Sequence, residues 1–375
     1  MPKKKVAKRV RNYEKFSPLF YVLCAFAILA LLVLILAVCS TGFSNAYNGS
    51  VGAVVRAFLA HLTSWIPFSL AEALLYTAPL LIVITVIYAC RYRCKSKKST
   101  LVFLATVVSV FSIFFSLFVL GFGVGYHTDP LDRRLDLPAE KVTVDELYDT
   151  ACWLAEETNR AAGEVSFGED RFSVMPYDRR ELCDRLLLAY GSVCGEYPFI
   201  QRLDSSIKPV LASEVMSHMH ITGVYTYFTG EANLNVNFPD YTLPYTAAHE
   251  LAHQRGIARE NEANFIAFLV TSRSEDAYIR YSGYLNLFEY VSSALYRVDR
   301  ERYREVIRSL DARVIDEMRA YSDFFDAYRD SAIANVSGAV NDAYLKLNGN
   351  EAGTASYGLV VDLAVAYRKA QASTK

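Results

Sequence analysis

Three long apolar stretches dominate the first third of the chain. Residues 19–38 form a nearly unbroken apolar run, and similar runs cover residues 70–90 and 101–121. A helix of about 20 apolar residues spans a hydrocarbon core of about 30 Å, because it rises about 1.5 Å per residue. The pattern therefore predicts three transmembrane helices within a membrane region over residues 18–125.

Basic residues are distributed unequally around these runs. The N-terminal segment 1–17 carries seven Lys and Arg residues against one acid, and residues 91–98 between the second and third runs are also basic. By contrast, residues 40–69 contain Arg56 and no other Lys or Arg. Since cytoplasmic loops are enriched in Lys and Arg, we expect a multi-pass protein of the cytoplasmic membrane. Its N-terminus would lie inside and everything after the third run outside.

The remainder of the chain reads as a linker and a helical domain. A polar segment bounded by prolines covers residues 126–142, and the predicted extracytoplasmic domain covers residues 143–375. Thr143 and Glu146 have the spacing of a capping box, which predicts the start of a helix. Apolar residues at helical spacing predict further helices over residues 179–190, 259–271, 278–332 (with an interruption at Gly283) and 360–369.

Two short segments are patterned as strands. Residues 221–228 and 232–238 are rich in β-branched, aromatic and alternating residues, which predicts a small β element. In the second segment the alternation would set apolar side chains against an asparagine face. If a peptide substrate lay along this strand, then Ala232, Asn233 and Asn235 would be substrate-binding residues. The alternative is a plain hairpin with a solvated asparagine face.

The chemistry is concentrated in one short stretch, His249-Glu-Leu-Ala-His253. On a helix, His249 and His253 lie one turn apart on the same face, and Glu250 lies beside them. This is the H-E-x-x-H arrangement of zinc metallopeptidases, in which the glutamate is the general base that activates water. The chain has only six histidines. The chance of finding two of them at this spacing by accident is therefore reduced. The alternative is an ordinary helix with two hydrogen-bonded histidines and a surface glutamate.

A catalytic zinc site needs a third protein ligand, and two carboxylates compete for the role. Glu262 shares a helix face with apolar residues that turn toward the core, and Ala263 beside it allows close helix packing. We therefore expect His249, His253 and Glu262 to bind one Zn2+ ion. Glu260 or Asn264 would then orient a histidine through its other ring nitrogen.

The overall charge argues against nucleic acid as a partner and says little else about function. The net charge of −1 gives no global field for nucleic acid or an acidic partner. His218 and His220 form an H-x-H pair, which is either an accessory metal site or, as we favour, two ordinary polar residues near a strand.

A family resemblance rests on two segments, Phe228-Thr-Gly-Glu-Ala-Asn-Leu-Asn and the stretch from Leu243 to Phe265 that contains the H-E-x-x-H motif. They resemble an uncharacterised bacterial membrane family, the domain of unknown function 3810, and the likeness extends to Tyr357-Gly and the last helix. That family is similar in its motif to gluzincin peptidases. The resemblance implies His249, His253 and Glu262 as ligands and Glu250 as the catalytic residue. Thermolysin-like gluzincins have an Asp four residues after the ligand Glu, where this chain has Ile266.

Together these inferences predict three transmembrane helices followed by a mainly α-helical, α+β, zincin-like domain of the gluzincin type with a small β element. The expected function is zinc-dependent peptide hydrolysis by a membrane-anchored enzyme. Its partners would be the lipid bilayer and a peptide or protein substrate at the outer face, with no nucleic acid. The alternative is a non-catalytic surface sensor or scaffold with a structural or vestigial zinc site.

Overall fold

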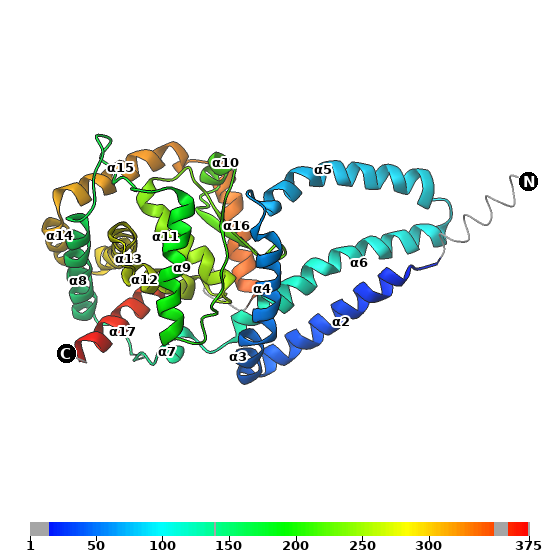
Figure 1. Ribbon diagram of the computed structural model, residues 1–375, viewed down its shortest axis with the longest axis horizontal. Coiled ribbons are helices and arrows are strands. Elements are labelled where there is room, and N and C mark those ends of the chain that lie inside the picture. Colours follow the sequence, from blue (N-terminus) through cyan, green and yellow to red (C-terminus); the bar gives the residue numbers. More distant parts are fainter. Residues whose placement is uncertain (1–14, 139, 349–358, 374–375) are drawn as a thin grey trace, which may run out of the picture.

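The computed structural model describes residues 15–138, 140–348 and 359–373. Long helices project to one side of a mostly helical body that contains a small sheet (Figure 1). The predicted basic segment 1–17 lies almost wholly outside the described residues, and so does Tyr357-Gly. The prediction of a mostly helical chain with three long apolar helices and a small β element is confirmed.

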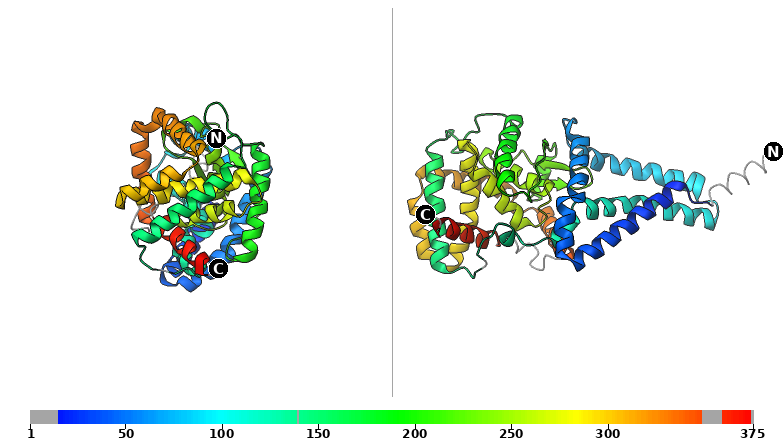
Figure 2. Two further views of the ribbon diagram at one scale, coloured as in Figure 1. Left: turned by 90° about the vertical axis from the view of Figure 1, so that its left-hand side faces the viewer. Right: turned by 60° about the horizontal axis from the view of Figure 1, so that its bottom comes forward.

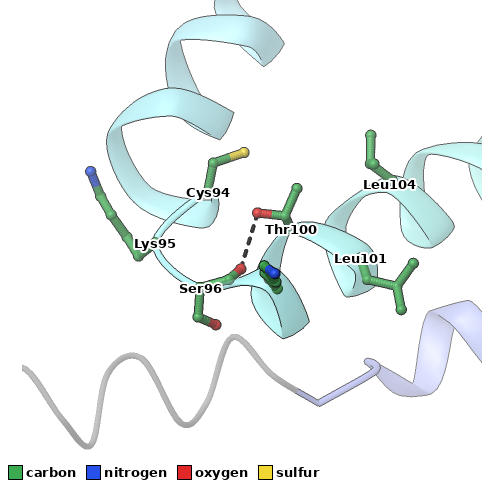
Figure 3. Close-up of a pocket in the computed structure, with 7 residues that line it drawn as sticks. Cys94, Lys95, Ser96, Thr100, Leu101 and Leu104 are labelled. Atoms are coloured by element: carbon green, nitrogen blue, oxygen red, sulfur yellow. Dashed lines mark hydrogen bonds between the residues drawn. The ribbon is translucent and has the colours of Figure 1, made fainter.

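Three helices are long and apolar enough to cross a membrane: α2 (Pro18–Cys39), α5 (Leu70–Tyr88) and α6 (Lys97–Gly121). They match the three predicted spans closely, and α5 continues as a π-helical turn over Ala89–Arg93. A tight turn with a shallow hollow joins α5 to α6 at the end farthest from the body (Figures 1 and 3). There the Thr100 hydroxyl donates to the Ser96 carbonyl at 3.0 Å.

The segment between the first two spans is helical. It forms α3 (Thr41–Gly49) and α4 (Val51–Ser64), and α4 lies across the ends of the spans where they meet the body (Figures 1 and 2). Its buried side carries Arg56, which is 1% exposed. This segment is therefore a structural layer between the spans and the body.

The body is a packed set of helices. The capping box at Thr143 is present and opens α8 (Val144–Ala162), which packs along α13 (Ala277–Val298). The predicted break at Gly283 is wrong, because α13 runs through it. A Cβ atom there would lie 2.1 Å from the Thr271 hydroxyl of α12 (Glu260–Ser272), so the glycine allows α12 and α13 to approach closely.

Nine further α-helices are described in the body, and several of them contribute to its hydrophobic core. Their bounds are α7 (Leu131–Arg134), α9 (Arg179–Glu196), α10 (Ser213–His218), α11 (Leu243–Gln254), α12 (Glu260–Ser272), α14 (Arg300–Ser309), α15 (Ala312–Arg329), α16 (Ala332–Leu347) and α17 (Leu359–Ser373). Buried residues of α8, α9, α11, α12, α13 and α17 share one hydrophobic core. The helix that carries the H-E-x-x-H motif is thus held inside the body.

The sheet has three short strands, β1 (Ile207–Pro209), β2 (Gly223–Thr226) and β3 (Glu231–Leu234), in the order β1-β3-β2. The predicted strand segments 221–228 and 232–238 form the shorter antiparallel pair β2–β3, whereas β1, parallel to β3, was not predicted. β3 is therefore the central strand.

Two carboxylates join the body to the second span. Glu231, at the start of β3, accepts hydrogen bonds from two backbone N–H groups in the first turn of α5, each at 3.0 Å. Glu72, in that same turn of α5, accepts from the backbone N–H groups of residues 211 and 212 at 2.9 and 2.7 Å. A carboxylate at a helix N-terminus satisfies N–H groups that have no partner within the helix. The body therefore caps the first turn of α5 through Glu231, and α5 caps residues 211 and 212 of the body through Glu72.

Candidate metal centre

Helix α11 carries His249, Glu250 and His253 into the centre of the body. Pro244 lies in its first turn, where the missing N–H costs no hydrogen bond. Its alanines and Leu251 are fully buried. The helix ends at Gln254, and Gly256 follows with a φ of +90°, a conformation that favours glycine. The sharp turn at Gly256 then leads the chain back into α12.

The two histidines meet a carboxylate from the start of α12. Nε2 of His249 lies 3.2 Å from Oε2 of Glu260, and Nε2 of His253 lies 3.6 Å from Oε1 of the same residue. One candidate ligand atom from each of the three residues lies within 4.8 Å of the others. Two imidazoles and one carboxylate are the ligand set of an open zinc site that keeps a further position for water or substrate. The group could therefore hold a metal ion.

Hydrogen bonds around the histidines favour this use. Nδ1 of His253 lies 2.7 Å from the carbonyl oxygen of Ile257, so Nδ1 carries a proton and Nε2 is the ring nitrogen directed toward Glu260. Such a backbone carbonyl commonly fixes the tautomer of a metal-binding histidine. Nδ1 of His249 is buried and has no hydrogen-bond partner within the described part of the chain. It is the other ring nitrogen from Nε2, the atom that faces Glu260.

Glu260, and not the predicted Glu262, is the carboxylate that the structure brings to the histidines. Oε1 of Glu262 lies 2.6 Å from Nη1 of Arg259 and accepts a hydrogen bond from the Leu131 N–H at 3.0 Å. Two residues along a helix differ by about 200° in direction, so the two glutamates point to different sides. Glu262 is buried as predicted, but against the linker rather than against α11. Its charge anchors the segment that follows the third span.

The predicted orienting role of Glu260 and Asn264 also changes. Glu260 is itself in the group, and the partner of the His253 ring nitrogen is the backbone carbonyl of Ile257. Asn264, one turn further along α12, lines the cavity in front of the group.

Electrostatics couple the three side chains. Burial disfavours the charged form of His253, but the negative charge and hydrogen bond of Glu260 outweigh it and raise the pKa of His253 to about 9. Burial likewise acts to raise the pKa of Glu260, yet the two histidines hold that pKa well below its usual range. A positive charge beside it therefore stabilises this carboxylate, whose side chain is 15% exposed. A bound cation would supply that charge in place of the proton.

Glu250 lies next to this group and is 5% exposed. Burial raises the pKa of its carboxyl, although the neighbouring histidines oppose the shift. Oε2 of Glu250 has no hydrogen-bond partner within the described part of the chain. Gly223 of β2 packs against the carboxyl so closely that an added Cβ atom would lie 2.6 Å from Oε1. The fold thus places a carboxyl of raised proton affinity directly between the histidines and the strand.

A cavity of about 1290 Å3 opens in front of these residues. Residues of β2, α11, α12, α13 and α16 line it. β2 pairs with β3 along one edge, and its other edge pairs with no strand among the described residues. All of its residues, 223–226, line the cavity. The free edge of β2 is therefore the main-chain surface that the cavity offers to a ligand.

The predicted substrate-binding residues Ala232, Asn233 and Asn235 do not lie at this edge. Ala232 and Asn233 belong to the central strand, whose backbone pairs on both sides. The amide of Asn233 donates to the Val224 carbonyl at 3.1 Å, and that of Asn235 to the Ile221 carbonyl at 2.8 Å. Both asparagines are buried, so the alternative of a solvated asparagine face is wrong as well. Their hydrogen bonds hold β2 and the residues just before it against β3.

Other cavity residues were missed by the sequence reasoning. Glu289 and Tyr290 on α13, and Tyr344 on α16, line the cavity together with the candidate metal-binding group. Burial and the charge of Glu317 raise the pKa of Glu289 to about 7. No motif spacing connects these residues with α11, since helix packing alone brings them there. By contrast, His218 and His220 contact α15, where Nε2 of His220 lies 2.8 Å from the Tyr328 carbonyl.

Comparison with known proteins agrees with the resemblance noted in the sequence. Residues 47–365 match the model of a family described as a protein of unknown function, DUF3810. The match covers most of the chain, which therefore belongs to this family. No curated protein and no solved structure matches the chain.

Proposed function

We propose that the protein is a membrane-anchored, zinc-dependent peptidase whose body is a zincin-like domain of the gluzincin type. The observation that carries the proposal is the His249, His253 and Glu260 group beside Glu250, at a cavity lined by the free edge of a strand. A metal site of purely structural use would need no cavity and no adjacent general base.

The residues divide into three roles. His249, His253 and Glu260 would hold a zinc ion, which acts as a Lewis acid and makes water more acidic when bound. Glu250 takes a proton from the attacking water and passes it to the departing amine, a task suited to a carboxyl whose pKa is raised by burial. The edge of β2 holds the peptide in extended form through main-chain hydrogen bonds. Specificity then comes from side-chain pockets in the cavity.

The test is a pair of substitutions in the full-length protein in detergent. Glu250→Gln removes the base but none of the candidate ligands, so zinc stoichiometry should stay at wild-type level. Cleavage of a mixed peptide library should fall by about 100-fold or more, the usual effect of losing a general base. Glu214→Gln, at an exposed position of α10, is the matched control and should cleave as wild type does.

Two results would contradict the proposal. Cleavage by Glu250→Gln at the wild-type rate would remove Glu250 from the reaction. A wild-type protein that binds zinc and cleaves no peptide of the library would favour a non-catalytic sensor or scaffold.

We further propose that the body lies outside the cytoplasmic membrane. The basic segment 91–98 between α5 and α6, set against the single basic residue of segment 40–69, supports this orientation. In that orientation the protein would act on peptides or proteins at the outer face and would meet no nucleic acid. A reporter active only outside the cytoplasm, fused after residue 375, should be active, and one inserted in segment 91–98 should be silent. The reverse pattern would overturn the orientation.

A further inference from the structure

The metal-binding group lies directly beyond the end of a spanning helix. Helix α6 has 25 residues, and about 20 residues cross a hydrocarbon core of about 30 Å. A membrane that α6 enters near Lys98 is therefore left near Phe118. The ring of Phe122, the first residue after α6, lies 5.7 Å from the ring of His253, centroid to centroid. The histidines therefore lie beyond the membrane surface by about the length of one or two side chains.

Helix α4 supports the same position of the membrane surface. It crosses the ends of the spans (Figures 1 and 2), and its side away from Arg56 is an apolar stripe. Val54, Phe58, Leu62 and Trp65 are 69%, 65%, 55% and 78% exposed. An exposed apolar stripe that ends in Trp is typical of a helix lying in the membrane interface. The body therefore rests on the bilayer rather than standing away from it.

The strand edge of the cavity begins at this surface. Tyr227 and Phe228 follow β2 and line the cavity. The Phe228 ring lies 5.4 Å from that of Phe114, and the Tyr227 ring 5.2 Å from that of Phe118. Both partners belong to the last two turns of α6. One end of β2 is therefore in contact with a spanning helix, and its other end, Gly223, is in contact with Glu250.

Helix α16 adds exposed apolar side chains to the cavity lining. Ile333, Val336 and Val340 of α16 line the cavity and are 53%, 65% and 65% exposed. Helix α16 lies on the side of the body that faces the spans (Figure 1). An extended segment rich in apolar residues would cover both this face and the edge of β2.

We propose that the substrates are polypeptides anchored in the same membrane, cut within about ten residues of the point where they leave it. The inference rests on the proposed peptidase function and names its substrate class. An extended chain advances about 3.3 Å per residue, so the five or so residues from Phe228 back to Gly223 span the distance from α6 to Glu250. A chain that leaves the bilayer beside Phe114 and Phe118 would follow β2 and reach the candidate metal group after those residues.

The test uses full-length, zinc-loaded protein in proteoliposomes. One peptide of mixed sequence is supplied in three forms: free, attached to a Leu-rich transmembrane anchor in the same vesicles, and attached to the same anchor in separate vesicles. Mass spectrometry locates each cut. The form in the same vesicles should be cleaved at least about tenfold faster than the other two, because anchoring raises the local concentration of the peptide. Its cuts should lie within about ten residues of the anchor, the reach of an extended chain over the body.

Each other outcome overturns the inference in a distinct way. Equal cleavage of the free peptide would leave the peptidase function standing and remove the membrane-anchored substrate class. Cuts that gather far from the anchor, or equal cleavage in separate vesicles, would do the same. Cleavage of none of the three forms would overturn the proposed function itself. A parallel series with Glu250→Gln identifies any cutting by a contaminating protease.

Discussion

Among single residues, Glu289 gives the clearest dependence of stability on pH. Burial and the charge of Glu317 raise its pKa from 4.5 to about 7 in the folded protein. Below pH 4.5 both folded and unfolded states hold the proton, so the raised pKa costs no stability there. Between pH 4.5 and 7 the unfolded state loses the proton and the folded state keeps it, so stability falls as pH rises. Above pH 7 the cost is complete.

Glu289→Gln should therefore gain stability relative to wild type as the pH rises from 4 to 8. The gain is at most about 3 kcal/mol, because a tenfold change in proton affinity corresponds to about 1.4 kcal/mol, and it is smaller because the side chain faces the cavity. Urea unfolding of both proteins at several pH values measures it. A difference between them that stays constant from pH 4 to 8 would contradict the assignment.

In the candidate metal-binding group, two of the three side chains could be predicted from the sequence and the third could not. The H-E-x-x-H motif predicts a shared face for His249 and His253, since both lie on one helix with a fixed period. The third member depends on the turn between α11 and α12, which sets the rotation of the second helix. Periodicity predicted that Glu262 is buried but could not say against what. The linker near Leu131 occupies that side of α12, and Glu260 is left facing the histidines.

At the scale of secondary-structure elements, the contact between β2 and α11 leaves no space for a side chain at Gly223. An added Cβ atom at Gly223 would lie within 3 Å of three atoms of Glu250. Gly223→Ala should therefore displace the Glu250 carboxyl and lower peptide cleavage by about tenfold or more, since small misplacements of catalytic groups are costly. Zinc stoichiometry should not change, because the three atoms nearest to the added Cβ atom all belong to Glu250, which is not a candidate ligand.

Gly195→Ala is the matched control. Gly195 lies in α9 with nothing within 4 Å of an added Cβ atom, and alanine favours a helix by about 1 kcal/mol over glycine. This variant should be as active as wild type and slightly more stable. Equal activity of the two variants would show that the strand does not position Glu250.

The elements themselves were predictable where a periodic pattern was long. The three spans and α8 follow from apolar runs and a capping box. The strand β1 was not predictable, because three residues carry no period and its pairing with β3 is parallel and non-local. The role of Gly283 also depends on a non-local contact. Glycine disfavours a helix and so predicts an interruption, but here it allows α13 to pack closely against Thr271. The central position of β3 likewise depends on β1, which pairs with its second edge.

At the scale of the whole molecule, the candidate metal-binding group is joined to the three long apolar helices through Arg56. This buried side chain donates to the Asn48 and Gly121 carbonyls at 2.8 and 3.0 Å. Asn48 in turn donates to the Gly256 carbonyl at 3.0 Å, in the turn that positions Glu260. Burial lowers the pKa of Arg56 to about 10, so it remains charged at neutral pH. The cluster ties α3, α4 and α6 to the turn after α11.

Arg56→Met should therefore destabilise the folded protein by about 3 kcal/mol, because it leaves several buried acceptors without a donor. Zinc affinity should fall with it, since the Gly256 turn loses its support. Thermal unfolding in detergent and zinc titration measure the two effects. Arg329→Met is the matched control, since Arg329 has a side chain 55% exposed in a surface ion pair, where a change is nearly neutral. Equal behaviour of the two variants would contradict the coupling.

Zinc affinity of the full-length protein tests the central claim most directly, in Glu260→Gln and Glu262→Gln compared with wild type. Loss of a direct ligand should cost more than the roughly 10- to 100-fold typical of residues around the ligands. We predict that Glu260→Gln weakens zinc binding by about 100-fold or more. Glu262→Gln, which loses an ion pair with Arg259, should bind zinc within a few-fold of wild type. Undiminished binding by Glu260→Gln, or the opposite order of the two variants, would contradict the claim that Glu260 is the third ligand.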